Sequence, residues 1–263
     1  MLWNLQRQYY LIIPKDYIIS KSKGNWRYKT GCTLHKNKKI EVRAMSKRLV
    51  IIHTTPVTIG LLRDIASEII KDCSIMNILD DSILPEINTL GHIPEDVRYR
   101  FNNYLVNAAT LKPDAILCAC SSMGNLVDEG RNLVGVPVLR IDEPMAEIAV
   151  NKGRNLGVAA TLTSTLEPTC SLVTRKAKTQ NKEIILEKLF IQGVGNLINE
   201  SREEEYDVIV SNKLLKLLES NDLVILAQAS MARALKLIPV ELREKFLVSP
   251  YTGMEAVKKL LGE

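Results

Sequence analysis

From about residue 48 to the carboxyl end, short apolar runs alternate with segments in which apolar residues recur at helical spacing. A short run rich in Val, Ile and Leu is typical of a buried strand, and apolar residues at i, i+3 and i+4 are typical of a helix with one buried face. The alternation therefore predicts a parallel sheet covered by helices on both faces. The expected strands are 49–54, 75–79, 115–120, 136–141, 155–160, 184–190, 223–228 and 246–249. The expected helices are 57–70, 96–111, 122–133, 144–152, 164–178, 201–219, 230–237 and 251–262.

Two of these strands end in similar sequences, Ala-Ile-Leu-Cys-Ala-Cys-Ser-Ser-Met at 115–123 and Leu-Val-Ile-Leu-Ala-Gln-Ala-Ser-Met at 223–231. In each, an apolar strand leads through small residues into a helix, and Cys120 and Gln228 stand 108 positions apart. The repeat predicts an α/β fold of two similar Rossmann-like lobes with parallel sheets, related by a pseudo-twofold. Because ligands of open α/β sheets bind beyond the carboxyl ends of the strands, we expect the active site in the cleft between the lobes.

The apolar pattern also predicts domain boundaries. We place the first lobe at 48–142 and the second at 143–245, and we expect 246–263 to return to the first lobe. Residues 1–47 differ from the rest, because they are rich in Lys, Tyr and Trp and show no lasting apolar period. They form a basic extension that is either a loosely attached, disordered tail or lies upstream of a true start at Met45. The third interpretation is a basic arm that binds nucleic acid or a protein partner.

The formal net charge of +5 hides an uneven distribution. Residues 1–48 carry 12 Lys and Arg against 2 Asp and Glu, whereas residues 49–263 carry 23 against 28. The main body is mildly acidic, which argues against a nucleic-acid surface there. No run reaches the roughly 18 apolar residues that span a bilayer, and five cysteines, an odd number, match no disulfide framework. We therefore expect a cytoplasmic protein without nucleic-acid or membrane partners.

Cys120 is the residue for which the sequence most clearly predicts chemistry. It ends the expected strand 115–120 and precedes a helix, whose first N–H groups are unpaired and carry the positive end of the helix dipole. Both features stabilise a thiolate, and the same N–H groups can bind a carboxylate. The alternative is that Cys120 is a buried apolar residue, as most free cysteines are. We expect Cys118 to face the other side of the sheet, so that the two thiols do not bind one metal ion.

Four short motifs follow one another along the chain: Ile-His-Thr-Thr-Pro at 52–56, Ala-Cys-Ser-Ser at 119–122, Gly-Val-Ala-Ala-Thr at 157–161 and Ser-Pro-Tyr at 249–251. Over about residues 48–263 their order and spacing resemble those of the aspartate/glutamate/hydantoin racemase superfamily. In that resemblance the first motif is the loop that helps to bind the substrate carboxylate, and the second supplies one catalytic thiol. The third opens the second lobe.

The resemblance implies a cofactor-independent mechanism that uses neither pyridoxal phosphate nor a metal ion. One thiolate removes the proton α to a carboxylate, and a second thiol on the opposite face returns a proton with inverted configuration. Hydrogen-bond donors around the carboxylate stabilise the carbanion, although Ser and Thr at helix starts are also common caps. The substrate-binding residues that the resemblance implies are Thr54, Thr55, Ser121, Ser122, Thr161, Ala229 and Ser230.

The chain departs from this pattern at Gln228, which stands where the second thiol is expected. Glutamine has no titratable group and cannot act as a general base, but it can orient a substrate carboxylate or amide by hydrogen bonds. A one-cysteine site leaves three routes: protonation of a carbanion on one face, covalent attack, or racemisation with another base such as His53. Arg140 could pair with a second carboxylate, although a salt bridge to Asp142 or Glu143 is the simpler expectation.

We therefore predict a cofactor-independent isomerase of the amino-acid racemase type. It would act on an amino acid or small carboxylate by proton transfer at the α-carbon through Cys120, with Gln228 at the second catalytic position. A one-cysteine decarboxylase or lyase of the same superfamily is the first alternative, and a non-catalytic protein that binds small carboxylates is the second. The resemblance is compatible with a homodimer or a larger assembly. We expect the loops 80–95 and 191–201 to set substrate specificity.

Overall fold

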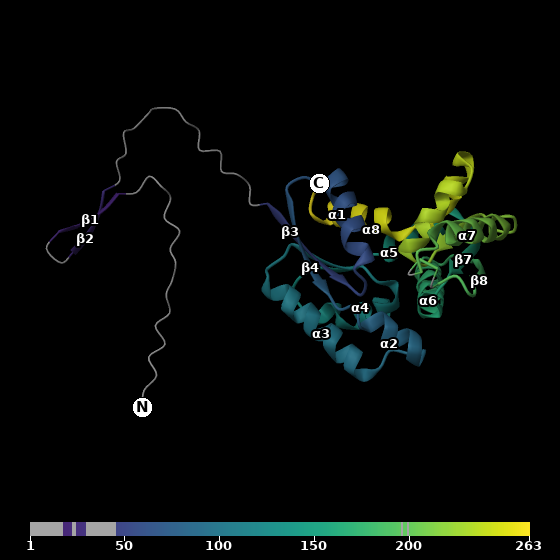
Figure 1. The fold of residues 1–263 in the computed structure, drawn as a ribbon, viewed down its shortest axis with the longest axis horizontal. Helices are drawn as coiled ribbons and strands as arrows, with labels where there is room; N and C mark the ends of the chain where they lie inside the picture. Colours follow the sequence, from purple (N-terminus) through teal and green to yellow (C-terminus); the bar gives the residue numbers. More distant parts are fainter. Residues whose placement is uncertain (1–17, 23–24, 30–45, 196, 199) are drawn as a thin grey trace. The chain divides into compact units, whose positions relative to one another are not determined.

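The computed structural model describes residues 18–22, 25–29, 46–195, 197–198 and 200–263 (Figure 1). The chain divides into two units, Met1–Ala44 and Met45–Glu263. In the first unit, β1 (Ile18–Ser22) and β2 (Asn25–Lys29) form an antiparallel hairpin. Most of the expected extension 1–47, including Cys32 and the alternative start at Met45, lies outside the described residues, so those expectations stay predictions.

A sheet of four parallel strands forms the centre of the first lobe, in the order β4-β3-β5-β6. The segments 49–52 and 115–118, in its two central strands, are at most 1% exposed. Continuous apolar strands of this kind are typical of parallel sheets covered on both faces. The strands are β3 (Lys47–His53), β4 (Cys73–Leu79), β5 (Ala115–Cys118) and β6 (Val138–Arg140).

The second lobe repeats this arrangement with the strand order β8-β7-β9-β10, again all parallel. The expectation that strand 246–249 returns to the first lobe is wrong, because residues 246–248 pair with β9. The sequence marks this segment as extended and apolar but carries no signal for the strand that it pairs with. The strands are β7 (Asn155–Ala160), β8 (Ile185–Phe190), β9 (Leu223–Leu226) and β10 (Phe246–Val248).

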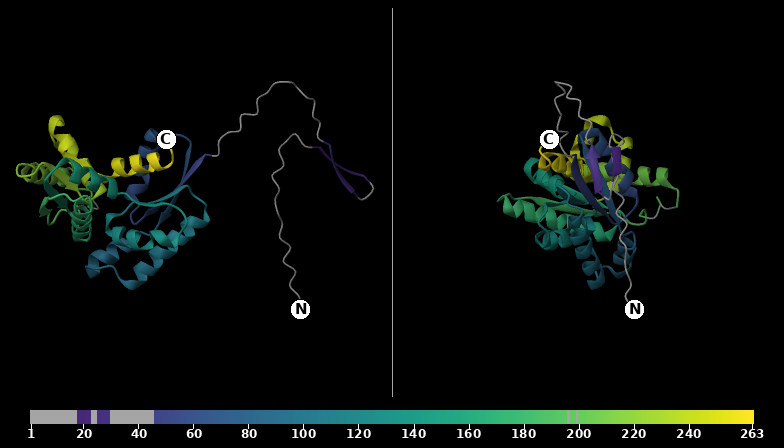
Figure 2. Two further views of the ribbon diagram at one scale, coloured as in Figure 1. Left: turned by 180° about the vertical axis from the view of Figure 1, so that it is seen from behind. Right: turned by 90° about the vertical axis from the view of Figure 1, so that its left-hand side faces the viewer.

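Helices flank both sheets, and the two four-stranded sheets confirm the predicted fold class (Figure 2). One helix, α2 (Ile83–Leu90), lies in the segment 80–95 that we expected to be a loop; it buries only Ile83 and Ile87, too few for a clear helical pattern. The other α-helices are α1 (Val57–Ile69), α3 (Glu95–Thr110), α4 (Gly124–Gly130), α5 (Glu143–Lys152), α6 (Thr163–Thr179), α7 (Glu203–Leu218) and α8 (Ser249–Leu260). The 3-10 helices are η1 (Ser121–Met123), η2 (Arg131–Leu133), η3 (Ala229–Leu237) and η4 (Val240–Lys245).

Two helices follow one sheet but pack on the other lobe. α5 follows β6 of the first sheet, yet Met145 and Ala149 lie in the core of the second sheet. α8 follows β10 of the second sheet, yet Met254 and Val257 lie in the core of the first, where α8 contacts α1 (Figure 1). The two helices also contact each other. Each lobe is therefore completed by a helix that comes from the other.

Residues along β5 alternate between the two faces of the first sheet. Ile116, Cys118 and Cys120 pack in one core cluster, whereas Leu117 and Ala119 pack in another. The expectation that the two thiols face opposite sides is wrong, because residues two apart in a strand point to the same side.

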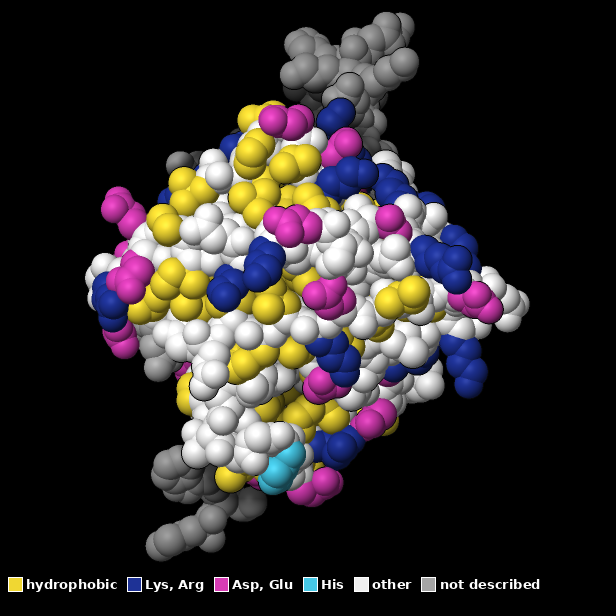
Figure 3. All heavy atoms as spheres, turned by 90° about the vertical axis from the view of Figure 1, so that its right-hand side faces the viewer, with side chains coloured by type: hydrophobic (Ala, Val, Ile, Leu, Met, Phe, Trp, Pro, Cys, Tyr) yellow, Lys and Arg dark blue, Asp and Glu magenta, His cyan; other side chains and the backbone are white. Residues whose placement is uncertain are grey.

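The surface drawn in Figure 3 shows Lys and Arg side chains interspersed with Asp, Glu and hydrophobic side chains. Neither positive nor negative side chains form a large continuous patch on this face. No helix within the described ranges is long and apolar enough to cross a bilayer.

Candidate active site

Cys120 stands at the corner where β5 leads into η1. Its backbone is extended, with φ −133° and ψ 116°, and it directly precedes the 3-10 helix. The Ala119 N–H donates to the Ile52 carbonyl oxygen at 2.9 Å, and the Met123 N–H donates to the Cys120 carbonyl oxygen at 3.2 Å. These two bonds tie the corner to β3 on one side and to the helix on the other, so the thiol lies at the carboxyl end of the sheet.

The Cys120 side chain is 9% exposed and lies among hydroxyl groups. Thr54 and Ser122, each 2% exposed, have hydroxyl oxygens that complete no hydrogen bond of good geometry within the described residues. Burial raises the pKa of the Cys120 thiol, and this outweighs the opposite effect of the nearby Thr54 hydroxyl and of the Met123 and Ser122 N–H groups. Burial therefore favours the neutral thiol form of Cys120, which lies beside unused hydrogen-bonding groups.

The corner after β9 repeats this backbone with a different side chain. Gln228 is extended, with φ −134° and ψ 137°, and directly precedes η3. The Ala227 N–H donates to the Ala159 carbonyl oxygen at 2.9 Å, and the Met231 N–H donates to the Gln228 carbonyl oxygen at 3.2 Å. Cys120 and Gln228 are therefore equivalent positions of the two lobes. We call their surroundings the first corner and the second corner.

The Gln228 amide is fixed by three hydrogen bonds to its side-chain oxygen. Gln228 Oε1 accepts from the Thr161 N–H at 2.6 Å, the Leu162 N–H at 3.2 Å and the Thr161 hydroxyl at 3.1 Å. Two of these partners are backbone N–H groups, which can only donate, so this end of the amide is the oxygen. Both hydrogens of Nε2 remain, without an acceptor among the described residues.

The remaining residues predicted for the site divide between the corners. The Thr55 hydroxyl accepts from the Val57 N–H at 3.4 Å, a bond at the start of α1, and its neighbour Thr54 faces Cys120. Thr161 is 5% exposed and binds Gln228. Thr54, Thr55, Ser121 and Ser122 belong to the first corner, and Thr161, Ala229 and Ser230 belong to the second.

Tyr206 is a residue at the second corner that the sequence reasoning missed. It lies on α7, is fully buried, and its hydroxyl completes no hydrogen bond within the described part of the chain. Burial raises its pKa, while the nearby Thr161 and Ser230 hydroxyls act in the opposite direction. The phenol therefore lies next to two predicted site residues. A lone tyrosine on the apolar face of a helix gives no signal of this in the sequence.

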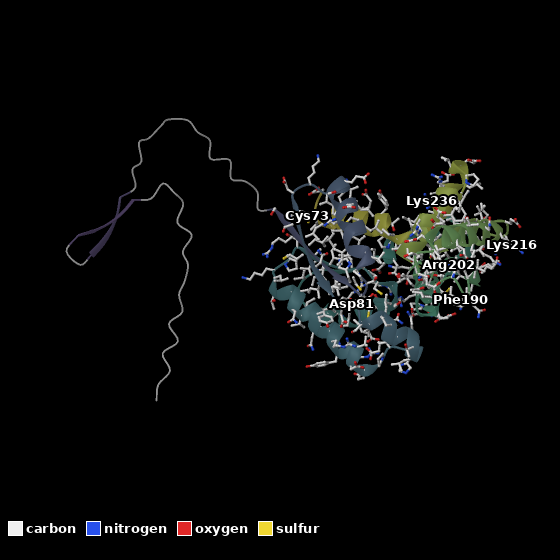
Figure 4. All side chains as sticks on the ribbon, viewed as in Figure 1. Cys73, Asp81, Phe190, Arg202, Lys216 and Lys236 are labelled. Carbon is white, nitrogen blue, oxygen red and sulfur yellow. The ribbon has the colours of Figure 1, made fainter. Side chains whose placement is uncertain are left out.

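Asp207, the next residue, holds η3 in place. It is fully buried, and its carboxylate accepts from Arg233 Nε at 2.8 Å and lies 2.6 Å from Lys236 Nζ. Both cations belong to η3, where Lys236 is labelled in Figure 4. One buried carboxylate on α7 thus pairs with both cations and positions the helix that follows Gln228.

His53, the alternative base, is engaged at both ring nitrogens. It is fully buried, with Nδ1 2.7 Å from Thr58 Oγ1 and Nε2 2.9 Å from Asn77 Oδ1. Burial lowers its pKa, and the bond to Asn77 opposes this. The geometry gives His53 a structural role, because neither nitrogen is free to take a proton from a substrate.

Arg140 is also fully paired. It is 1% exposed and binds Asp142 through two hydrogen bonds of 2.9 Å each, as the simpler expectation had it, and Asp128 through one of 2.7 Å. It packs against Gly124, where a side-chain Cβ would collide with the guanidinium. Asp128 also binds Arg175 of α6 at 2.6 Å, so this cluster links the two lobes.

The two corners are connected through α6. This helix begins directly after Leu162, a partner of Gln228, and it contacts η1, the helix that follows Cys120. Within the described residues, no group of three or more His, Cys, Asp and Glu side chains is arranged to hold a metal ion.

Comparison with known proteins identifies the family. The model of the Asp/Glu/Hydantoin racemase family matches residues 54–256, a span that contains both corners. The chain belongs to the Asp/Glu/Hydantoin racemase family. No curated protein sequence matches it.

Solved structures of this family share its fold. Allantoin racemase from Klebsiella pneumoniae superposes with a TM-score of 0.61 at 15% identity, covering 82% of this chain and 88% of that one. Glutamate racemase RacE1 from Bacillus anthracis gives 0.61 at 17% identity, covering 83% of each chain. Aspartate racemase from Picrophilus torridus gives 0.62 at 15% identity, covering 82% and 94%. At such low identity these likenesses show the fold, and family membership supports a racemase-type function.

Proposed function

We propose that the protein is an enzyme of the racemase type that moves a proton at the α-carbon of an amino acid or another small carboxylate through Cys120, without pyridoxal phosphate. The observation that carries the proposal is the buried thiol beside the unpartnered hydroxyls of Thr54 and Ser122. It lies at the carboxyl end of a parallel strand, where α/β sheets bind their ligands. Membership of a family named for racemases supports the same assignment.

The first corner supplies donors for a substrate carboxylate. The N–H groups of Thr54 and Thr55 have no acceptor among the described residues, and they precede α1, whose N-terminus favours an anion. The hydroxyls of Thr54 and Ser122 can donate two further hydrogen bonds. We propose Ser121 beside them, and Thr161, Ala229 and Ser230 from the second corner, as the rest of the substrate-binding set.

In the proposed step, the Cys120 S–H bond breaks and its proton forms a bond to a carbanion at the α-carbon, leaving a thiolate. In the reverse direction the thiolate takes the α-proton and the electron pair of the C–H bond stays on the carbon. The donors around the carboxylate stabilise the carbanion. Burial raises the pKa of Cys120 and so favours its thiol form, the form that acts as the proton donor in this step.

A one-cysteine decarboxylase or lyase is the second candidate, and Gln228 favours it. We propose that Gln228 occupies the position of the second catalytic thiol, where it has no proton to exchange and can only orient the substrate. When a carboxylate leaves as CO₂, the electron pair of the broken C–C bond stays on the α-carbon and no base is needed. The Cys120 thiol then protonates that carbon on one face, and solvent restores the thiol.

The test is exchange of the α-proton with solvent deuterium, followed by NMR, for a panel of amino acids and small dicarboxylates. We expect exchange with the wild-type protein and a loss of about 10²- to 10⁴-fold in Cys120→Ser. Cys118→Ser is the matched control, because Cys118 is a buried thiol two residues away on the same face and should leave most of the exchange intact.

The other outcomes separate the candidates. Exchange that survives in Cys120→Ser would contradict proton transfer through this thiol. Release of CO₂ from a dicarboxylate without exchange would identify the decarboxylase, and ligand binding with neither reaction would identify a non-catalytic carboxylate-binding protein. Racemisation gained by Gln228→Cys would support the assignment of Gln228 to the position of the second thiol.

We also propose a cytoplasmic location. The four cysteines in the described part of the chain, Cys73, Cys118, Cys120 and Cys170, are all free thiols, as is usual in a reducing compartment.

A further inference from the structure

The two corners carry equivalent sets of hydrogen-bond donors. Thr54 and Thr55 follow β3 and precede α1, and Thr161 and Leu162 follow β7 and precede α6. The two pairs stand 107 positions apart in the sequence. Each provides two backbone N–H groups and a threonine hydroxyl at the N-terminus of a helix of more than three turns.

At the second corner the donor set is already occupied. The Gln228 oxygen accepts from both N–H groups and from the Thr161 hydroxyl, at 2.6 to 3.2 Å. A carboxylate oxygen would make the same three bonds, so Gln228 takes the place that an anion would fill at this helix N-terminus.

At the first corner the equivalent donors are open. The equivalent side chain is Cys120, whose sulfur is a weak acceptor. The N–H groups of Thr54 and Thr55 find no acceptor in the described residues, and the hydroxyls of Thr54 and Ser122, both 2% exposed, complete no hydrogen bond there. Buried polar groups without partners are costly, and a ligand that pairs with them removes this cost.

The basic side chains of η3 and the arginine at the end of β6 are held in ion pairs. Arg233 and Lys236 are paired with the buried Asp207, and Arg140 of the first lobe is paired with Asp142 and Asp128. What the second corner still offers is the pair of hydrogens on Gln228 Nε2. An amide N–H₂ binds an uncharged carbonyl oxygen well, but by itself it does not balance the cost of burying a carboxylate.

We propose that Gln228 is an internal ligand that closes the second corner to anions, so that the substrate has one carboxylate, bound at the first corner, and an uncharged hydrogen-bond acceptor directed to Gln228 Nε2. The substrate class thus resembles an amino-acid amide or a ureido acid more than a dicarboxylic amino acid. The statement about substrates rests on the proposed function, whereas the occupation of the donor sets can be tested without any reaction.

The first experiment titrates the ¹⁵N-labelled wild-type protein with sodium formate and follows the backbone amides by NMR. Formate is the smallest carboxylate and probes the donor sets alone. We expect saturable shifts at Thr54 and Thr55 and none at Thr161 and Leu162. Equal shifts at both corners, or shifts at the second corner only, would overturn the proposal.

The second experiment opens the second corner by Gln228→Ala. Formate should then raise the midpoint of thermal unfolding by about 2–4 °C more than in wild type, where it binds only at the first corner. The comparison is made at ten times the dissociation constant of formate for the second corner, relative to an equal ionic strength of a bulky anion. Gln180→Ala is the matched control, because Gln180 lies at the opposite end of α6, where no free helix N–H groups occur. Gln228→Glu keeps an oxygen among the donors and should respond to formate no more than wild type does. A response in Gln180→Ala equal to that in Gln228→Ala would overturn the assignment, and so would a response in Gln228→Ala no larger than that of wild type.

The third experiment compares ligands that differ only in an amide or a carboxylate. Asparagine is compared with aspartate, and glutamine with glutamate, as competitors for the formate-induced shifts of wild-type Thr54 and Thr55. We expect the amide of at least one pair to compete at least about tenfold better than its acid. Stronger competition by both acids would overturn the substrate class. Loss of the proposed chemistry would appear instead as an absence of exchange and CO₂ release while the formate shifts persist.

Discussion

At the end of β5 the chain places a thiol next to hydroxyls without partners, and at the equivalent end of β9 it places an amide whose oxygen is held by three donors. The backbone is the same at both, down to the N–H groups that tie each corner to the neighbouring strand at 2.9 Å. The comparison shows that a duplicated scaffold can keep its hydrogen-bond frame while one side chain decides whether the site is open or filled.

A second contrast lies one strand further along. Arg140 ends β6 and is 1% exposed, whereas the equivalent residue of the second lobe, 108 positions later, is the apolar Val248 at the end of β10. The first lobe therefore buries an ion pair with Asp142 where the second lobe has no charge.

The largest effect that we predict is on the free energy of unfolding, when one partner of this ion pair is replaced and the other stays. Arg140→Met should destabilise the protein by about 3–5 kcal/mol, because Asp142 is left as a buried charge without its partner. Chemical denaturation would measure the change. Arg175→Met removes a half-exposed cation from Asp128 and is the control, with an expected cost of about 1 kcal/mol or less. If the two substitutions lowered the unfolding free energy equally, the buried pair with Asp142 would contribute no more than the half-exposed pair with Asp128.

An intermediate effect is expected from truncating the two equivalent side chains. Gln228→Ala should cost about 1–3 kcal/mol of unfolding free energy, because two N–H groups and a hydroxyl lose their acceptor. Cys120→Ala removes no hydrogen bond of that kind and should cost about 1 kcal/mol or less. Parallel urea titrations at pH 7 without added carboxylate would measure both. A larger loss in Cys120→Ala would reverse our description of which corner is filled.

The smallest effect that we predict is on the pH dependence of stability, and it comes from Asp80 in the first lobe. Burial raises the pKa of Asp80, but bonds to Ser82 and Tyr104 and the charge of Arg100 more than compensate, so its pKa lies below the ordinary value. A carboxyl with a lowered pKa stabilises the fold above its unfolded pKa of about 3.9, and this contribution is lost as pH falls through the lower, folded value. Thermal unfolding between pH 7 and pH 3 should show a shallower acid loss in Asp80→Asn than in wild type. If the unfolding midpoint of Asp80→Asn fell with pH as steeply as that of wild type, the acid sensitivity would come from other groups.

The sequence predicted the strands well because each buried strand is a continuous apolar run, a local property. It could not predict that β10 pairs with β9, since pairing depends on residues more than twenty positions away. The sequence did not predict α2, because only two of its residues are buried and they give no clear helical pattern. At the site, position and motif indicated Cys120 and Gln228, whereas the contacts of the Gln228 oxygen with Thr161 and Leu162 arise from chain segments 66 and 67 positions apart. Tyr206 and Asp207 reach the second corner in the same long-range way.

The exchange of α5 and α8 between the lobes has a consequence for synthesis of the chain. The face of the first sheet that holds Leu49 and Leu117 is covered in part by Met254 and Val257, which are synthesised more than 130 residues after Leu117. Until then the nascent first lobe has an apolar surface without its cover, and such surfaces are where chaperones bind and aggregation begins. The first lobe therefore finishes folding only when α8 has been synthesised, long after its own strands.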